Sequence, residues 1–212
     1  MRARLLGSAL RLVAAKGPAA TSIDDIIETA EVSRGTFYKY FPSPDVLVRE
    51  LAFELAKELV HLADPLVRER SDPAERVACG IRLVARLALH HPAAAGFLVQ
   101  LGWPDTQGDI VLLNFVRRDV AAGMKQGRFR RMPMPLALNM VSGGVIGAIH
   151  CMLKDPCEPD FAEMTAAAVL RALGVAGRTA DALAHKRLEL PPDFAEGLLA
   201  ATLPVAGRAR TA

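Results

Sequence analysis

A run of residues from 33 to 40 carries the side-chain types that proteins use to contact a DNA duplex. Arg34 can donate two hydrogen bonds to the edge of a guanine, and Thr36 can contact the methyl group of a thymine. Gly35 has no side chain, so the backbone at this position can approach a phosphate closely. The hydroxyl, phenol and ammonium groups nearby can reach phosphate oxygens. The pattern predicts DNA contacts by Ser22, Ser33, Arg34, Gly35, Thr36, Tyr38, Lys39 and Tyr40.

Two short helices joined by a tight turn would position these side chains. Ser22 precedes an apolar run and is followed three residues later by Asp25, so the first helix begins with a pair that resembles a capping box. Ser33 is a good N-cap for the second helix. Phe37 and Phe41 lie four residues apart on that helix and share one face. They would fix the helix on a core and leave its other face free.

These helices and their flanks resemble the TetR family of transcription regulators. The resemblance rests on residues 21–26 (Thr-Ser-Ile-Asp-Asp-Ile), residues 32–41 (Val-Ser-Arg-Gly-Thr-Phe-Tyr-Lys-Tyr-Phe), the preceding helix at 9–17 and Leu47. It implies an all-helical homodimer. Each subunit would have an N-terminal three-helix helix-turn-helix domain and a larger C-terminal helical domain that dimerises and usually binds a small molecule. The activity it implies is repression, relieved by that ligand, at a nearly palindromic double-stranded DNA operator.

Two positions depart from the family pattern. Glu31 occupies the turn position that usually holds glycine, and a left-handed conformation there would cost about 1–2 kcal/mol. Pro44 stands where the family commonly has a lysine that meets the phosphate backbone. Losing this cation predicts a lower DNA affinity or a weaker dependence on salt.

The chain reads as helical throughout, with no alternation typical of strands. We expect a DNA-binding domain at 1–46, a ligand-binding and dimerisation domain at 47–190 and a tail at 191–212. Besides the two short helices, the expected helices cover residues 2–16, 45–63, 73–90, 93–101, 106–126, 135–154, 159–173 and 178–185, with a short amphipathic piece at 193–203.

Charge alone does not indicate a protein that binds nucleic acid. The 212 residues have a formal net charge of +3, and residues 1–50 hold seven basic and six acidic side chains. A single subunit with so few cations would bind DNA weakly, so we expect dimerisation to be needed.

The three cysteines, Cys79, Cys151 and Cys157, lack the number and spacing of a disulfide framework or a zinc site. We expect them to be buried, unpaired small hydrophobes in a reducing cytoplasm. The N-terminal residues lack the long apolar core of a signal peptide. The sequence therefore predicts a cytoplasmic protein without a metal or other cofactor.

Residues 136–153 form a nearly continuous apolar run that includes Gly143-x-x-x-Gly147. Such a run can cross a membrane. It has no partner span and is interrupted by polar residues, so we expect instead a helix buried between other helices. Small residues allow two backbones to approach. We therefore predict a two-helix dimer face with Gly143, Gly147, Ala166 and Leu170.

A ligand pocket between the helices would be mostly apolar with a few polar groups, so we expect an apolar effector. The candidate wall residues are Phe97, Trp103, Phe115, Met140 and His150. Each of these side chains could equally fill a core.

Two other classes of function stay open. An all-helical enzyme would need a nucleophile with a base, paired carboxylates or a metal cluster. The adjacent His90 and His91 point in different directions on a helix, and we find no motif of a known catalytic class. A dimerisation module without DNA binding would be insensitive to changes at Arg34 or Lys39.

Overall fold

The computed structural model describes residues 1–17, 20–100, 111–189 and 197–200, and within these ranges the secondary structure is helical without a strand. This confirms the predicted all-α class. The helices are α1 (Arg2–Lys16), α2 (Ile23–Thr29), α3 (Arg34–Tyr40), α4 (Pro44–Arg68), α5 (Pro73–His90), α6 (Pro92–Gln100), α7 (Val111–Lys125), α8 (Met134–Lys154), α9 (Phe161–Ala172), α10 (Gly177–Ala184) and α11 (Gly197–Ala200).

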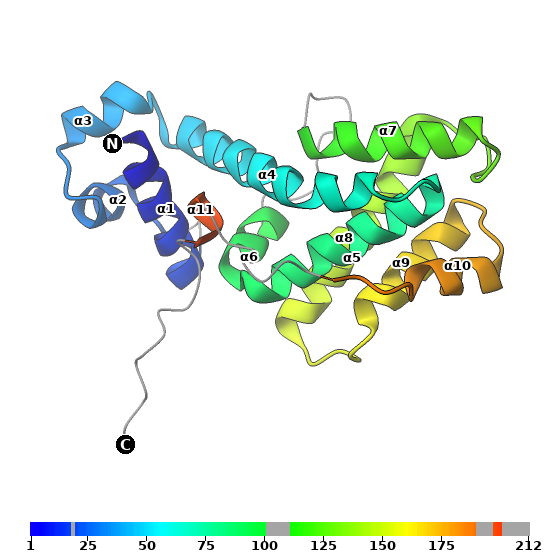
Figure 1. The fold of residues 1–212 in the computed structure, drawn as a ribbon. Coiled ribbons are helices and arrows are strands. Elements are labelled where there is room, and N and C mark those ends of the chain that lie inside the picture. The colour runs from blue at the N-terminus through cyan, green and yellow to red at the C-terminus, as the bar shows by residue number, and fades with distance from the viewer. Residues whose placement is uncertain (18–19, 101–110, 190–196, 201–212) are drawn as a thin grey trace, which may run out of the picture.

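The three N-terminal helices form a head at one end of the molecule, and α4 runs from this head into a larger helical body made by α5–α10 (Figure 1). The head core holds the fully buried Phe37 of α3 and Phe41, the residue that caps its C-terminus, together with Leu5 and Leu10 from α1. This confirms that the predicted aromatic pair fixes α3 on a core. Leu51 and Leu55 of α4 belong to the same apolar cluster, so α4 is shared by head and body.

The sequence predicted that α4 ends near residue 63, and this prediction is wrong. The helix continues through Pro65 to Arg68. A proline inside a helix removes one backbone hydrogen bond, here the one to the carbonyl of residue 61. Ala63 and Val67 are buried on either side of it, so their burial offsets the loss. At its other end the helix begins at Pro44. Proline lacks a backbone N–H, but the N–H at the first position of a helix has no partner within the helix, so proline is well suited to this position.

The apolar helix α8 lies against α5, α6, α7 and α9. By length and composition alone it could cross a membrane, but its contacts are those of a central helix in a bundle. Within one subunit α8 is not buried on all sides, because Leu136, Gly147, His150 and Cys151 are exposed along one stripe. Cys151 thereby departs from the expectation for the cysteines, whereas Cys79 is buried and all three are free.

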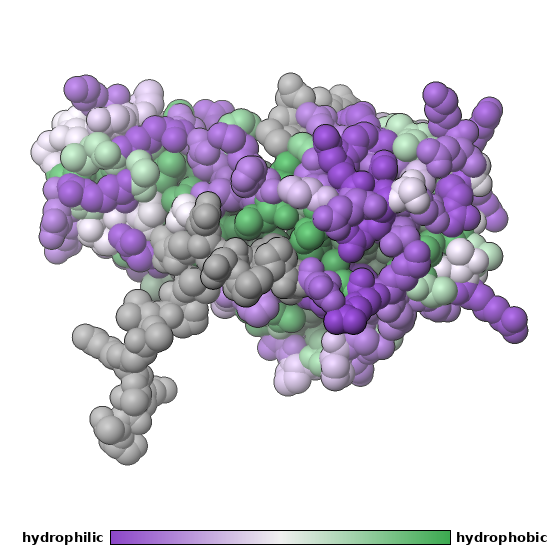
Figure 2. Space-filling view, viewed as in Figure 1, coloured by the Kyte–Doolittle hydropathy of each residue, from purple (hydrophilic) through white to green (hydrophobic). Residues whose placement is uncertain are grey.

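Hydrophilic and apolar residues occupy different parts of the molecular surface. Figure 2 shows hydrophilic residues over α7 and the end of α4, and apolar residues in a band where α4, α5 and α6 meet. This band lies at the junction of head and body.

Candidate functional site

The structure places the predicted DNA-contacting residues at α3 and at the N-terminus of α2 in the head, and most of them are exposed. Arg34, Gly35 and Lys39 are exposed, and the two tyrosines of α3 are 46% and 37% exposed at Tyr38 and Tyr40. Thr36 is half-buried, while Ser22 and Ser33 lie at the N-termini of α2 and α3. The α3 surface therefore combines a guanidinium, an ammonium and two phenols around a residue without a side chain, which suits a DNA groove.

The two serines hold the helices in place. Ser33 Oγ accepts a hydrogen bond from Thr36 N at 3.1 Å and lies 2.9 Å from Thr36 Oγ1. Ser22 and Asp25 form the predicted capping box, in which Ser22 N donates to the carboxylate at 2.8 Å. Hydrogen bonds from Lys16 and then from Ser22 hold the pKa of Asp25 well below its usual range. In the free protein the donors of Ser22 are thus engaged by Asp25.

Arg34 is held by Asp24 from the neighbouring helix. Its Nη2 donates to Asp24 Oδ1 at 2.9 Å and to Oδ2 at 3.2 Å, and the two side chains are 59% and 71% exposed. An exposed ion pair contributes about 0–1 kcal/mol. Arg34 can therefore leave Asp24 and bind a DNA base with only a small loss of free energy.

The turn between α2 and α3 contains Glu31 with φ +50°, as predicted for a position that usually holds glycine. Its backbone N–H donates to Glu28 O at 3.0 Å, and its carbonyl accepts from Arg4 Nη2 at 3.0 Å. These bonds offset part of the cost of the left-handed conformation.

Gly35→Ala should weaken DNA binding without weakening the fold. A Cβ here would meet only Ser33 Oγ, at 3.9 Å, and alanine in a helix is favoured over glycine by about 0.5–1 kcal/mol. The thermal unfolding midpoint should stay the same or rise. The added methyl group keeps the backbone away from a phosphate, so affinity for a cognate duplex should fall about tenfold, measured by fluorescence anisotropy. Unchanged affinity would mean that the backbone at Gly35 does not approach DNA.

An apolar cavity of about 160 Å³ lies between α4, α5, α7 and α8. Its walls include Val60 and Ala63 of α4, Ile81 of α5 and Val145 of α8. Because α4 forms one wall and also enters the head core, the cavity contacts the helix that carries the head.

Of the predicted ligand-binding residues that the structure describes, Phe115 lines this cavity. Phe97 is 2% exposed in the head cluster, Met140 packs against the body core, and His150 is exposed on α8. These three residues therefore do not line this cavity. Trp103 lies outside the described residues.

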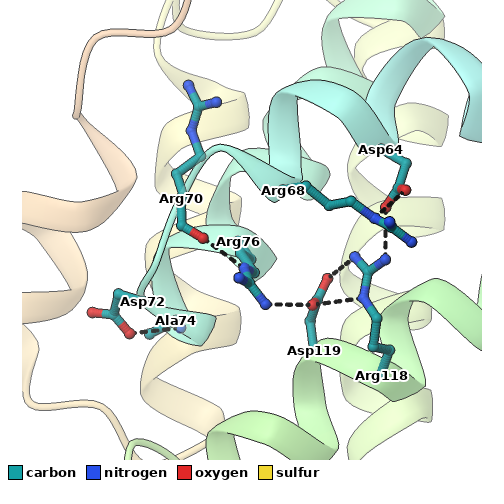
Figure 3. A network of polar contacts seen from close by, with 8 residues as sticks. All are labelled: Asp64, Arg68, Arg70, Asp72, Ala74, Arg76, Arg118 and Asp119. Atoms are coloured by element: carbon teal, nitrogen blue, oxygen red, sulfur yellow. Dashed lines mark hydrogen bonds and ion pairs between the residues drawn. The ribbon is translucent and has the colours of Figure 1, made fainter.

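Four charged side chains that line the cavity, Asp64, Arg76, Arg118 and Asp119, belong to one network of polar contacts (Figure 3). Arg118 of α7 donates from Nη1 to Asp64 Oδ1 of α4 at 2.8 Å, and from Nε and Nη2 to the carboxylate of Asp119 at 3.0 and 2.8 Å. Arg76 of α5 lies 3.6 Å from Asp119, and Arg68 of α4 lies 2.6 Å from Asp64. The hydrogen bond to Asp119 is the main reason that the pKa of Arg118 lies above its usual value. Sequence reasoning missed this group, since its members come from three segments that are far apart in the chain.

The exposed stripe of α8 lies beside an open face of α9. Gly147 is exposed with no atom within 4 Å of an added Cβ, Gly143 is half-buried, and Met164 of α9 is 49% exposed. The prediction for Ala166 and Leu170 is wrong, because both are 0% exposed inside a single subunit. They leave no surface for a partner.

Close approach of the two helices occurs within the subunit, at a neighbouring glycine. A Cβ on Gly144 would lie 2.6 Å from Val169 Cγ2. The small residues of α8 thus serve internal packing at Gly144 and leave an exposed surface at Gly147.

A buried ion triad joins α5 to α9. Glu163 Oε1 accepts from Arg82 Nε at 3.0 Å and from Arg86 Nη2 at 2.7 Å, and Arg82 also donates to Lys186 O at 2.7 Å. Arg82 and Glu163 are 5% and 6% exposed. Burial acts to raise the pKa of Glu163, but hydrogen bonds, that from Arg82 first, leave it below the usual value.

Comparison with known proteins assigns the chain to a family. Residues 5–51 match the family of bacterial regulatory proteins named tetR, and residues 72–186 match the tetracyclin repressor-like C-terminal domain. The transcriptional regulator EthR of Mycolicibacterium smegmatis is 35% identical over 94 residues, 44% of this chain and 43% of that protein. The match thus spans less than half the length of this curated relative.

Solved structures match over most of the chain. Ligand-free RolR has a TM-score of 0.74 and 31% identity and covers 90% of this chain and 98% of RolR. RolR in complex with resorcinol has a TM-score of 0.69 and 30% identity, with 90% and 96% covered. A TetR-family regulator from Shewanella sp. PV-4 shares the fold, with a TM-score of 0.72 at 20% identity over 82% and 98% of the two chains. The head of α1–α3 and the helical body are thus the two parts of a DNA-binding transcriptional regulator, not an enzyme, and the chain belongs to the TetR family.

Proposed function

We propose that this regulator is a homodimeric repressor that binds a nearly palindromic operator in the cytoplasm and releases it when a small effector enters the body. The observation that carries the proposal is the shared helix α4. Its residues Leu51 and Leu55 belong to the head core, and its residues Val60 and Ala63 line the cavity. A ligand in the cavity therefore touches the helix that aims α3.

Two subunits would present their α3 helices to successive major grooves about 34–36 Å apart. Arg34 would read a guanine, and Tyr38, Lys39 and Tyr40 would bind phosphates. The exposed stripe of α8 around Gly143 and Gly147, with Met164 of α9, would form the dimer face. Residues 1–46 would act as the DNA-binding domain and 47–190 as the effector-binding and dimerisation domain.

The effector we propose is a small, uncharged molecule with one ring and at least one hydroxyl group. The cavity of about 160 Å³ is close in size to an engineered protein cavity of about 150 Å³ that accepts benzene. Among its lining residues, Asp64 and Asp119 balance Arg76 and Arg118. A hydroxyl can donate to such a carboxylate and accept from such a guanidinium. RolR, a relative with 30% identity, forms a complex with resorcinol, a benzene ring with two hydroxyls.

Such an effector shifts the head only as far as it binds one arrangement of α4 better than the other. Arg118 joins α7 to Asp64 of α4 at 2.8 Å. A ligand hydroxyl that replaces one partner of this hydrogen bond would be bound with different affinity in two positions of α4. This gives the ligand the differential affinity that release of DNA requires.

Selection from a random duplex library by the purified protein tests the proposal, with Arg34→Ala and Lys39→Ala in parallel. The wild type should enrich a two-fold symmetric site. Arg34→Ala should lose about 1–3 kcal/mol and relax the preference at one base pair, while Lys39→Ala should weaken all sequences alike and reduce the salt slope by about one. Equal loss of specific and non-specific binding in Arg34→Ala would contradict base reading.

The enriched duplex then tests the effector. Titration with simple phenols should release the duplex, whereas benzoate, which adds a charge to a balanced cavity, should not. If neither the phenols nor benzoate releases the duplex while the protein still selects a symmetric site, the protein is a sequence-specific DNA-binding protein and the proposed effector is wrong.

A further inference from the structure

The described segment Gly197–Ala200, helix α11, is a single turn of helix that follows the body in the chain and is far in sequence from the head. It lies beside α1 (Figure 1) and contacts both α1 and α4. Its Leu199 is 1% exposed and its Leu198 is 9% exposed, and both belong to the apolar cluster of the head with Leu5 and Leu55. A segment that follows the body in the chain therefore completes the core of the DNA-reading head.

A carboxylate on α4 anchors this turn. Glu58 Oε1 accepts from Leu198 N at 2.8 Å, and Glu58 Oε2 accepts from Leu199 N at 2.9 Å. Hydrogen bonds from backbone N–H groups to an ionised carboxylate are among the stronger ones in proteins. Both oxygens of one side chain are thus used to fix the start of α11 on α4.

Gly197 makes the close approach possible. Its φ of +63° lies in the left-handed region, and a Cβ there would lie 2.3 Å from Glu58 Oε1. A side chain at this position would collide with the anchoring carboxylate. The anchor therefore depends on Glu58 on one side and on the absence of a side chain at Gly197 on the other.

The anchored turn lies across the joint that sets the direction of α3. The head packs on α4 and α6, so a change in the angle between α1 and α4 would also change the direction of α3. Two apolar side chains wedged against α1, with their backbone tied to α4, resist a change in that angle. Adding one base pair between half-sites moves the second groove by about 3.4 Å and rotates it by about 34°, which a head free to pivot could follow.

We propose that Gly197–Ala200 is a strap that locks the head onto α4 and makes the dimer strict about the spacing of its two half-sites. Glu58 is its positioning residue. This rests on the proposed function, because spacing has meaning only for a dimer on a two-fold symmetric operator. When the strap is released, the affinity of the dimer for operators of altered spacing should be close to its affinity for the operator with the best spacing.

The test uses the operator selected by the full-length wild type, together with versions that carry one base pair more or fewer at the centre. Gly197→Ala and Glu58→Ala release the strap from its two sides. Glu69→Ala is the control, since Glu69 is exposed on the far end of α4 and pairs with Arg70. Wild type and control should lose about tenfold or more in affinity on the altered operators, and both strap variants less than about threefold.

The same spacing ratio in all four proteins would overturn the proposal. So would a uniform loss on every operator, because a strap that only stabilises the fold acts alike on all of them. Gly197→Ala leaves every residue of the head and α4 unchanged, and its circular dichroism spectrum, compared with that of the wild type, separates strap release from loss of folding.

If the wild type selects no symmetric site, the proposed function fails, and a DNA-free measurement still tests the lock. Spin labels at Thr29→Cys in the head and Ala121→Cys in the body are placed on one chain that also carries Cys151→Ser and Cys157→Ser, diluted with unlabelled protein. Thr29 and Ala121 are both exposed. The distance distribution should be broader with Gly197→Ala, and an unchanged width would overturn the strap.

Discussion

Replacing Glu163 with alanine should lower the free energy of unfolding by about 3–5 kcal/mol, because it leaves the guanidinium of Arg82 buried without its carboxylate. Glu163 accepts from Arg82 and Arg86 at 3.0 and 2.7 Å and is 6% exposed. Guanidinium-induced unfolding followed by circular dichroism measures the loss. Glu158→Ala, at an exposed position just before α9, should change stability by less than about 0.5 kcal/mol.

The same triad predicts that the free energy of unfolding decreases as the pH falls into the acid range. The pKa of Glu163 lies below its usual value of 4.5, so its contribution is fully present above that pH and is lost as pH falls through the folded-state pKa. Glu163→Ala should therefore remove part of the acid sensitivity that the wild type shows below about pH 4.5. A loss under about 1 kcal/mol at neutral pH would mean that water reaches the triad and replaces the missing carboxylate.

Gly147→Glu should turn the proposed dimer into monomers and reduce operator affinity by about a hundredfold or more, because in the proposed interface the added charge would meet its own copy across the two-fold axis. Gly147 is exposed, and nothing lies within 4 Å of an added Cβ, so the subunit itself should fold normally. Sedimentation velocity measures the assembly, and circular dichroism checks the fold.

The matched control for this prediction is Ala121→Glu. Ala121 is exposed on α7, so the change adds the same charge in a helix away from the α8 stripe. The control should remain a dimer and bind DNA as the wild type does. A Gly147→Glu protein that still sediments as a dimer would place the interface elsewhere on the molecule.

The head was predictable because its signals are local. Ser22 with Asp25, Ser33, and the pair Phe37 and Phe41 each act within one or two helical turns, and all of them take their expected places in the structure. Even the left-handed backbone at Glu31 follows from its position in a tight turn.

The body was less predictable because its contacts are not local. Asp64 and Arg118 are 54 residues apart, and Arg82 and Glu163 are 81 apart, so no spacing links them before the helices pack. On α9 small and apolar residues occur around the helix, and composition cannot tell that Ala166 and Leu170 face inward while Met164 faces outward. The end of α4 was misplaced because Pro65 is a strong local signal that the burial of Val67 overrides.

The unbroken course of α4 has a mechanical consequence. From Ala63 at the cavity to Leu47 in the head, the helix spans about 25 Å at about 1.5 Å per residue. A rigid rod of that length needs to tilt by only about 8° at one end to carry the other about 3.4 Å, the rise of one base pair. Under the proposed function, a tilt of this size at the cavity end of α4 would move α3 by about one base pair along the duplex.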